Sequence, residues 1–260
     1  MDHINSTQNI LKAKLKSGKQ VFGTWSMIPN ATVMNILSSA NLDFVISDLE
    51  HGAISLETLE NLIYANEATN SSLVVRIPKL NQESILRVLE VGTRSIIMSH
   101  VDSTELAKFL VSAVTYPPLG TRGLSPFTKN HIYSDKNITQ KMENLNQQML
   151  VGVLIEGKAG MEKIEKIAEV PGIDLMYLGI YDLAAQYGYL KDLENPEFLK
   201  IIEKFAVKIH KTGKKIGTVA TNHSQIGYLK GIGFDFIAFR NDAALIMDSA
   251  LHAKKIFEEA

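Results

Sequence analysis

Two acidic residues that could bind a divalent metal stand at the ends of two successive predicted strands. Glu156 ends the apolar run Met149–Ile155, and Asp182 follows the run Asp174–Leu178. The chain contains no cysteine, so a metal here must take oxygen or imidazole ligands, which suits a hard ion such as Mg2+ or Mn2+. The spacing leaves one alternative open, in which the two carboxylates bind Arg76 or the loop backbone separately.

A carboxylate and an imidazole follow another predicted strand, Asp43–Asp48. Asp48 and His51 are separated by two residues, so the carboxylate could orient the imidazole as a general base near neutral pH. A histidine that is simply hydrogen-bonded in a loop is the alternative. Arg76 stands within the apolar run Leu73–Ile77. Because burying an unpaired charge is costly, we expect Arg76 to face a polar cavity.

Polar residues at other strand ends carry weaker signals. His100 and His223 each lie close to the end of a predicted strand and are weak candidates for the site. Asn222 and Asp242 are adequately explained as helix N-caps, because caps favour the same residue types.

The elements that must position these residues alternate regularly along the chain. Strands are predicted at Val21–Met27, Asp43–Asp48, Leu73–Ile77, Ser95–Val101, Met149–Ile155, Asp174–Leu178, Lys215–Val219 and Phe234–Phe239. Helical patterns lie between them, at Ser55–Ala68, Glu83–Val91, Thr104–Val114, Lys158–Ala168, Pro196–Lys211 and Asn222–Lys230, with a last helix at Ala243–Glu259.

This alternation predicts an α/β fold with eight strand–helix units. The strand runs are continuously apolar, as expected for parallel strands that are covered on both faces. Eight units in 260 residues predict a single (β/α)8 barrel domain over residues 1–260, with its active site at the carboxyl ends of the strands. A doubly wound sheet is disfavoured, because no strand leads into a glycine-rich phosphate-binding loop. The segment Thr115–Asp135 lacks periodicity, and a loop this long is expected to be a lid or a pocket wall.

The composition of the chain argues against two classes of binding partner. The chain has 27 basic and 28 acidic residues and a formal net charge of −1, so a general surface for nucleic acid or an anionic membrane is not expected. No apolar run approaches the roughly 20 residues that cross a bilayer, and the N-terminal residues lack a signal-peptide pattern. We expect a soluble, cytoplasmic protein.

The order of the motifs resembles the HpcH/HpaI family of class II, metal-dependent pyruvate aldolases. The resemblance runs from Phe22–Trp25 to Arg240–Asp242, and its most specific pieces are Ser47-Asp48-Leu49-Glu50-His51, Val75-Arg76, Val91-Gly92-Thr93, Tyr116–Gly123, Ile155-Glu156 and Gly179–Leu183. His51 in the D-x-E-H motif favours the HpaI-like aldolases over the citrate lyase β-type proteins.

The resemblance implies a reaction and roles for the site residues. A 4-hydroxy-2-oxo acid or a 2-oxo-3-deoxy sugar acid would be cleaved to pyruvate and an aldehyde through a metal-stabilised enolate. Glu156 and Asp182 would hold Mg2+ or Mn2+, with Co2+ possible. Arg76 would donate to the keto or enolate oxygen, and His51, oriented by Asp48, would assist proton transfer.

The resemblance also implies the surroundings of the site. Trp25 and Val219 match positions that line the substrate cavity. The last helix exchanges between protomers in this family, which implies a homo-oligomer, commonly a hexamer built from dimers.

Several residues depart from the family pattern. Leu154 stands where a Gln is typical, Ser99 replaces a Pro, and Arg240 brings a cation to a position that is usually small. Tyr181 also replaces a small residue, so it could narrow the pocket or add a hydroxyl donor to substrate. These departures leave two alternatives open: a non-aldolase of the same fold, such as a 2-oxo acid decarboxylase or another C–C or C–O lyase, and an inert scaffold.

Overall fold

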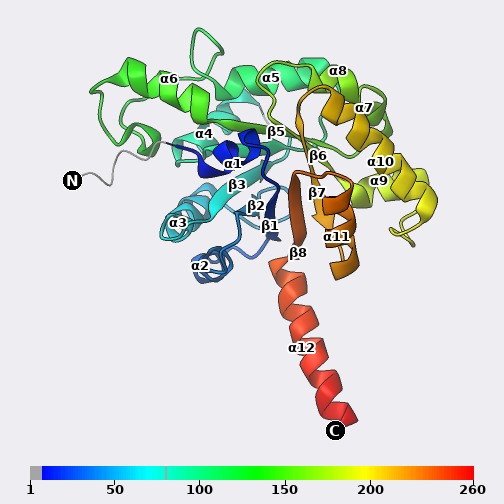
Figure 1. Cartoon of the computed structure of the whole chain (residues 1–260). Coiled ribbons are helices and arrows are strands. Elements are labelled where there is room, and N and C mark those ends of the chain that lie inside the picture. The colour runs from blue at the N-terminus through cyan, green and yellow to red at the C-terminus, as the bar shows by residue number, and fades with distance from the viewer. Residues whose placement is uncertain (1–7, 80) are drawn as a thin grey trace.

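Eight parallel strands close into a barrel in chain order, with β8 returning to pair with β1 (Figure 1). The computed structural model describes residues 8–79 and 81–260. The strands are β1 (Val21–Ser26), β2 (Phe44–Asp48), β3 (Ser72–Ile77), β4 (Ser95–Met98), β5 (Leu150–Ile155), β6 (Leu175–Leu178), β7 (Lys215–Ala220) and β8 (Phe236–Asn241). The predicted (β/α)8 barrel is confirmed. Residues 1–7 and 80 of the predicted 1–260 domain lie outside the described residues.

Helices lie around the barrel, most of them between successive strands, and the last one projects away from it (Figure 1). They are α1 (Ile10–Lys16), α2 (Ala31–Ser39), α3 (Leu56–Glu67), α4 (Gln82–Glu90), α5 (Thr104–Val114), α6 (Ile138–Gln148), α7 (Lys158–Glu162), α8 (Ile164–Ala168), α9 (Ile180–Tyr187), α10 (Pro196–Lys211), α11 (His223–Gly231) and α12 (Asp242–Glu259). The helix predicted over 158–168 is two short helices, because Lys163 leaves the helical conformation with φ −102° and ψ 8°. Within the described ranges, no helix has both the length and the apolar character needed to cross a membrane.

The apolar strands are buried on both faces, as their continuous hydrophobic runs predict. Every residue of β2, β4, β5 and β6 is buried. Inside the barrel, the rings of Phe44 and Phe236 stack with centroids 3.7 Å apart. Gly23 makes room for them, since a Cβ there would lie 2.5 Å from the Phe44 ring. The interior is therefore a packed core and not a channel.

One end of this interior core is covered by α1. Leu11 and Leu15 of that helix are buried in the same cluster as the inward-facing strand residues. Lys12 Nζ lies 2.8 Å from Asp174 Oδ2 and also donates to the carbonyl of Met149. Both partners directly precede strands, so α1 covers the amino ends of the strands and leaves the carboxyl ends for the site.

The irregular segment Thr115–Asp135 lies at the amino edge and contributes no residue to the cavity at the carboxyl edge, whereas its Pro117, Pro118 and Leu119 line a separate surface hollow. It follows α5 and leads through α6 into β5, so the chain has already returned to the amino ends of the strands. Its anchors are Arg122, which bonds Glu90 at 2.9 Å, and Asn130, which donates to the carbonyl of Leu89 at 2.6 Å. The segment contains one 3-10 turn, η1 (Lys129–His131).

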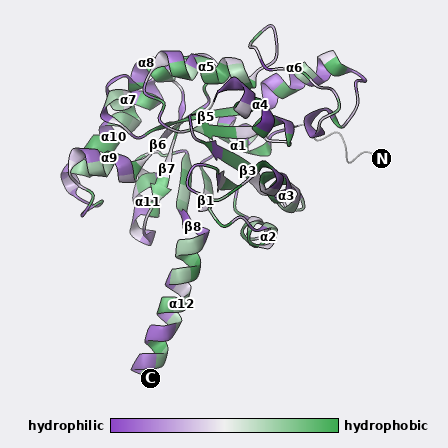
Figure 2. Cartoon of the chain, turned by 180° about the vertical axis from the view of Figure 1, so that it is seen from behind, coloured by the Kyte–Doolittle hydropathy of each residue, from purple (hydrophilic) through white to green (hydrophobic). Residues whose placement is uncertain are grey.

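The last helix, α12, extends away from the barrel (Figure 1). Figure 2 shows hydrophobic residues along α12 interspersed with hydrophilic ones. Its large apolar side chains Ile246, Met247, Leu251, Ile256 and Phe257 are all more than half exposed.

The first turn of α12 is anchored to the barrel by Asp242. The carboxylate of Asp242 accepts hydrogen bonds from Ser26 Oγ at 2.9 Å and from the N–H of Met27 and of Ile28 at 3.0 Å. Asn241, and not Asp242, is the N-cap residue of α12.

Candidate active site at the carboxyl end of the barrel

A cavity with about 200 Å³ of water-accessible volume opens at the carboxyl ends of the strands. Its lining residues are Trp25, Met27, Asp48, His51, Arg76, Tyr181, Val219, Arg240, Asn241 and Ala244. The structure thus brings together six of the site residues predicted from the sequence, from five different strand ends. The two predicted metal ligands, Glu156 and Asp182, are not among these lining residues.

Arg76 and Asp48 form a buried pair at the edge of this cavity. Arg76 Nε donates to Asp48 Oδ1 at 2.7 Å, and a second nitrogen of the guanidinium bonds the other carboxylate oxygen. The guanidinium also lies 3.3 Å from Glu50 and 4.7 Å from the centre of the Trp25 ring. Burial works against the charged form, but the hydrogen bonds and charge of Asp48, together with the charge of Glu50, raise the pKa of Arg76. Arg76 is therefore a fixed cation at the cavity edge.

Asp48 holds the loop after β2 through backbone bonds. Its Oδ1 accepts from the N–H of Glu50 at 3.0 Å and from the N–H of His51 at 3.2 Å. Over the described part of the chain, no hydrogen bond joins the Asp48 carboxylate to the His51 ring, which is exposed at the cavity. Asp48 thus positions His51 through its main chain, whereas the sequence suggested direct orientation of the ring.

Glu156 is the buried acid of the site. It directly follows β5 and is 5% exposed, and its Oε1 accepts from the N–H of His100 at 2.8 Å. Burial raises the pKa of Glu156, the neighbouring His100 opposes that rise, and the negative charges of Glu50 and Asp182 add to it. A nearby cation stabilises the ionised form of such a carboxylate.

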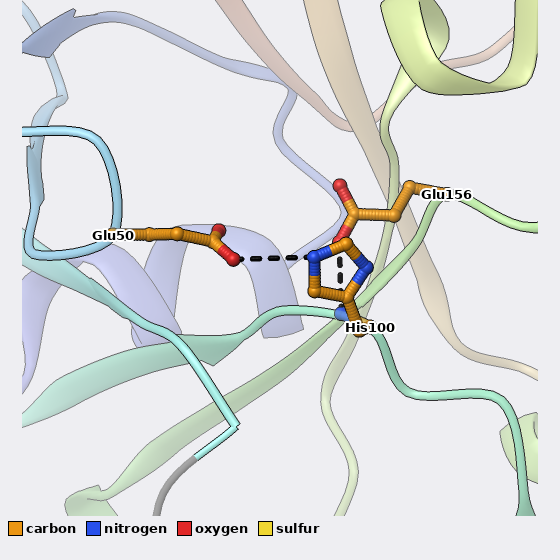
Figure 3. Close-up of side chains that lie close together, drawn as sticks. All are labelled: Glu50, His100 and Glu156. Carbon is orange, nitrogen blue, oxygen red and sulfur yellow. Dashed lines mark hydrogen bonds and ion pairs between the residues drawn. The ribbon is translucent and has the colours of Figure 1, made fainter.

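Glu156 lies in a compact cluster with Glu50 and His100 (Figure 3). One potential ligand atom from each of the three residues lies within 4.8 Å of the other two. Asp182 is exposed in the first turn of α9 and stands outside this cluster, although its charge acts on Glu156. The two carboxylates and the imidazole of this cluster are a donor set that fits a divalent cation.

Gly179 preserves the space that the Glu156 carboxylate occupies. A Cβ at Gly179 would lie 2.7 Å from Glu156 Cβ and 3.2 Å from its Oε2. The backbone of Gly179, with φ −81° and ψ 85°, does not itself require glycine. Glycine is therefore needed at position 179 because a side chain there would collide with Glu156.

Aromatic and aliphatic side chains form the apolar part of the cavity and of the core beneath it. Trp25 Nε1 donates at 3.0 Å to the hydroxyl of Tyr177, which is buried in the barrel interior. Leu154 is 2% exposed in that same apolar core, so it offers the site no polar group. Tyr181 is half-exposed at the rim, and Val219 is half-buried in the wall.

Arg240 occupies a left-handed backbone conformation, with φ 49°, which is rare for a bulky residue. Its guanidinium donates to the carbonyl of Thr221 at 2.8 Å and pairs with Asp248 at 2.6 Å. Its Nε is buried, with no hydrogen-bond partner among residues 8–79 and 81–260. The other candidates at this edge have structural roles: Asn222 caps α11, as predicted, and the His223 ring packs against Phe239.

Sequence reasoning ranked two members of the cluster too low. Glu50 was only part of a motif and His100 only a weak candidate, because a lone histidine near a strand end is usually an ordinary loop residue. The available signal was positional: each lies two residues beyond the end of its strand, β2 or β4, at the edge where Glu156 lies.

A parallel barrel with convergent carboxylates, imidazoles and a guanidinium at its carboxyl edge defines a barrel enzyme with a polar, cation-attracting site. The profile of the HpcH/HpaI aldolase/citrate lyase family matches residues 21–249, and the chain belongs to this family. It is a carbon–carbon lyase of the aldolase type.

Two relatives and a solved structure match nearly the whole chain. A 2-dehydro-3,6-dideoxy-6-sulfogluconate aldolase of Pseudomonas putida is 29% identical, over 91% of this chain and 92% of the relative. A 4-hydroxy-2-oxo-heptane-1,7-dioate aldolase of Shigella boydii is also 29% identical, over 94% and 92%. The crystal structure of an HpcH/HpaI aldolase from Desulfitobacterium hafniense superimposes with a TM-score of 0.89 at 26% identity, covering 96% of this chain and 97% of that one.

Proposed function

We propose that this protein cleaves a 4-hydroxy-2-oxo acid, or a 2-oxo-3-deoxy sugar acid, into pyruvate and an aldehyde. The observation that carries the proposal is the juxtaposition of two groups at one barrel edge. The Arg76–Asp48 pair and His51 line a small cavity, and the buried Glu156 lies beside it within a cluster of potential metal ligands.

Glu156 and Asp182 would hold the divalent ion, for which Mg2+, Mn2+ and Co2+ are the candidates. The negative charges of Glu50 and Asp182 already disfavour ionised Glu156, so a cation at this position relieves repulsion among acids. The bound ion supplies a Lewis acid to the oxygens of a 2-oxo acid.

Arg76 stabilises the charge that develops as the C3–C4 bond of the substrate breaks. The electron pair of that bond moves toward the C2 keto oxygen, and a guanidinium directed at this oxygen stabilises the transition state more than the ground state. Asp48 accepts two of the five N–H donors of Arg76, so outer N–H groups are left for the substrate. The buried pair fixes the guanidinium before substrate arrives.

His51 moves the protons. In the cleavage direction its imidazole accepts the proton of the C4 hydroxyl, which becomes the aldehyde carbonyl, and a proton is then delivered to C3 to give pyruvate. The exposure of His51 at the cavity wall and the bond from its N–H to Asp48 support this role.

The substrate would be enclosed by the side chains that line the cavity around the Arg76–Asp48 pair, namely those of Trp25, Tyr181 and Val219.

Arg240 favours a substrate whose aldehyde portion ends in an anionic group. It lines the same cavity, and its partner Asp248 is half-exposed, so an incoming carboxylate or sulfonate can compete for the guanidinium. The two relatives described above act on a sulfogluconate derivative and on a dioate, which both carry a second acidic group.

A 2-oxo acid decarboxylase, or another C–C or C–O lyase, is the second candidate. It is favoured by Leu154, which is buried in the apolar core where a Gln is typical and so gives the site no polar group, and by Tyr181 at the cavity rim. A decarboxylase would release carbon dioxide and no aldehyde, so product analysis separates the two activities. An inert scaffold would produce neither.

We also propose that the protein is a homo-oligomer, with a hexamer built from dimers as the expected form. The exposed apolar side chains of α12, such as Leu251 and Phe257, support packing of this helix against a second copy.

The experiment is a cleavage assay over a panel of 4-hydroxy-2-oxo acids and 2-oxo-3-deoxy sugar acids, with and without a terminal acidic group. Pyruvate and aldehyde are both quantified, after treatment with chelator and again after addition of Mn2+. We expect metal-dependent release of both products in equal amounts, and loss of turnover in His51→Ala. Metal-independent turnover, or turnover that is unchanged in His51→Ala, would contradict the proposal.

A further inference from the structure

His100 lies between two carboxylates at the carboxyl end of the barrel (Figure 3). Its Nδ1 is 2.9 Å from Glu156 Oε1, and its Nε2 is 3.2 Å from Glu50 Oε1. The backbone at His100 is left-handed, with φ 55°, a conformation that residues other than glycine adopt at a free-energy cost. Its own N–H donates to Glu156 Oε1, so the main chain and the ring both approach the same oxygen.

Glu50 is fixed in place from its other side. Its Oε2 accepts from the hydroxyl of Ser99 at 2.5 Å and lies 3.3 Å from the Arg76 guanidinium. The side chain of Glu50 is 12% exposed, so this oxygen is anchored and Oε1 is left facing His100. A carboxylate held in this way can accept the Nε2–H of His100, which selects the tautomer with its lone pair on Nδ1.

That tautomer directs an unprotonated nitrogen toward Glu156. A carboxylate that orients a histidine whose other nitrogen binds a metal is a recurring arrangement in metal sites. The alternative for the same three residues is a doubly protonated His100 that bridges Glu50 and Glu156 as a simple ion pair. The 2.9 Å between Nδ1 and Glu156 Oε1 is compatible with both arrangements. The observation that points to a bound cation is the convergence of one potential ligand atom from each of Glu50, His100 and Glu156 within 4.8 Å.

We propose that His100 is a nitrogen ligand of the divalent ion through Nδ1, beside Glu156, and that Glu50 positions its ring. This inference rests on the proposed function, since it concerns the same metal. A nitrogen donor shifts the preference of the site away from Mg2+ and toward Mn2+, Co2+ and other transition ions. Ser99 and His100 act together here, because Ser99 anchors the carboxylate that orients the imidazole.

The test is pulsed electron paramagnetic resonance on the full chain loaded with Mn2+ alone. A directly bound imidazole nitrogen modulates the electron spin echo of the ion, whereas a histidine in an ion pair with the carboxylates does not. We expect nitrogen modulation in the wild type and its loss in His100→Ala, with retention in His51→Gln and in His223→Ala, the matched control at another strand end. We also expect the ratio of Co2+ to Mg2+ affinity, measured by calorimetry, to fall at least about tenfold in His100→Ala.

The wild-type spectrum alone tests the role of His100, even if a variant fails to fold. Bound Mn2+ without nitrogen modulation would overturn the role of His100 while leaving the metal site of the proposed function intact. Modulation that survives in His100→Ala but disappears in His51→Gln would also overturn it, by assigning the nitrogen to His51. Absence of Mn2+ binding altogether would overturn both this inference and the metal in the proposed function, and Glu156→Gln provides the reference for that outcome.

Discussion

Replacing Gly179 with alanine tests whether the space beside Glu156 sets the metal affinity. The added Cβ would lie 2.7 Å from Glu156 Cβ, and ordinary contacts begin at 3.4 Å, so the two carbons must separate by about 0.7 Å. Metal sites tolerate deviations of only about 0.2 Å in ligand distance. We therefore expect divalent-ion affinity to fall about 10- to 100-fold, the range seen when the support of a ligand is disturbed.

The stability of the fold changes much less in this variant. The backbone at Gly179 suits alanine, and such a substitution stabilises by about 0.4–1 kcal/mol through the unfolded chain. Crowding of a packed site costs about 1–3 kcal/mol. The net change in the free energy of unfolding is thus a fraction of the total, and the variant is expected to fold.

The assay is calorimetric titration with Mn2+, accompanied by urea unfolding. Gly157→Ala is the matched control, because it flanks Glu156 from the other side and its Cβ would meet only Gln186, at 3.7 Å. Its affinity should match the wild type. Unchanged Mn2+ affinity in folded Gly179→Ala would refute the reasoning that places Glu156 in the metal site.

Three other perturbations address the guanidinium, a buried histidine and the last helix. Arg76→Lys cannot reproduce the two-bond pairing with Asp48, so kcat/KM for cleavage should fall about 100-fold in steady-state assays, and a change of less than about threefold would contradict the role of Arg76. Burial lowers the pKa of His131 below its usual value of about 6.5. Between that value and the native pKa, the native state therefore binds fewer protons than the unfolded chain. The free energy of unfolding should decrease as pH falls through this interval. Urea unfolding about one pH unit above and below 6.5 should show that His131→Gln loses this dependence, and an identical pH dependence in the variant would contradict it. Leu251→Glu on exposed α12 should dissociate the oligomer in light scattering while changing the barrel by less than about 0.5 kcal/mol, whereas an unchanged mass would argue against packing through α12.

The barrel could be predicted because its strands are short, separate and apolar throughout. Runs such as Leu73–Ile77 and Asp174–Leu178 recur between helical patterns, and the topology of a parallel barrel then assigns the active edge without any knowledge of contacts. This rule alone placed Asp48, Arg76 and Glu156 together at one edge, where the structure has them.

The features of the site that could not be predicted depend on backbone conformation and on contacts between residues far apart in the sequence. His100 joins the cluster with Glu50 and Glu156 from a left-handed backbone conformation, which no sequence pattern indicates. Asp48 was expected to meet the His51 ring, but Arg76 on the neighbouring strand takes its carboxylate. Asp242 was assigned to a helix cap, but it binds the backbone after β1, a contact between distant ends of the chain.

The proposed function requires this site to form an enolate from pyruvate, and this step can be tested without knowing the aldehyde. Protein loaded with Mn2+ is incubated with pyruvate in deuterium oxide, and deuterium in the pyruvate methyl group is followed by mass spectrometry. The proposed function predicts exchange that requires the metal and is lost in Glu156→Gln and in His51→Ala. Exchange at the uncatalysed rate, in metal-loaded protein whose binding of Mn2+ has been verified, would contradict it.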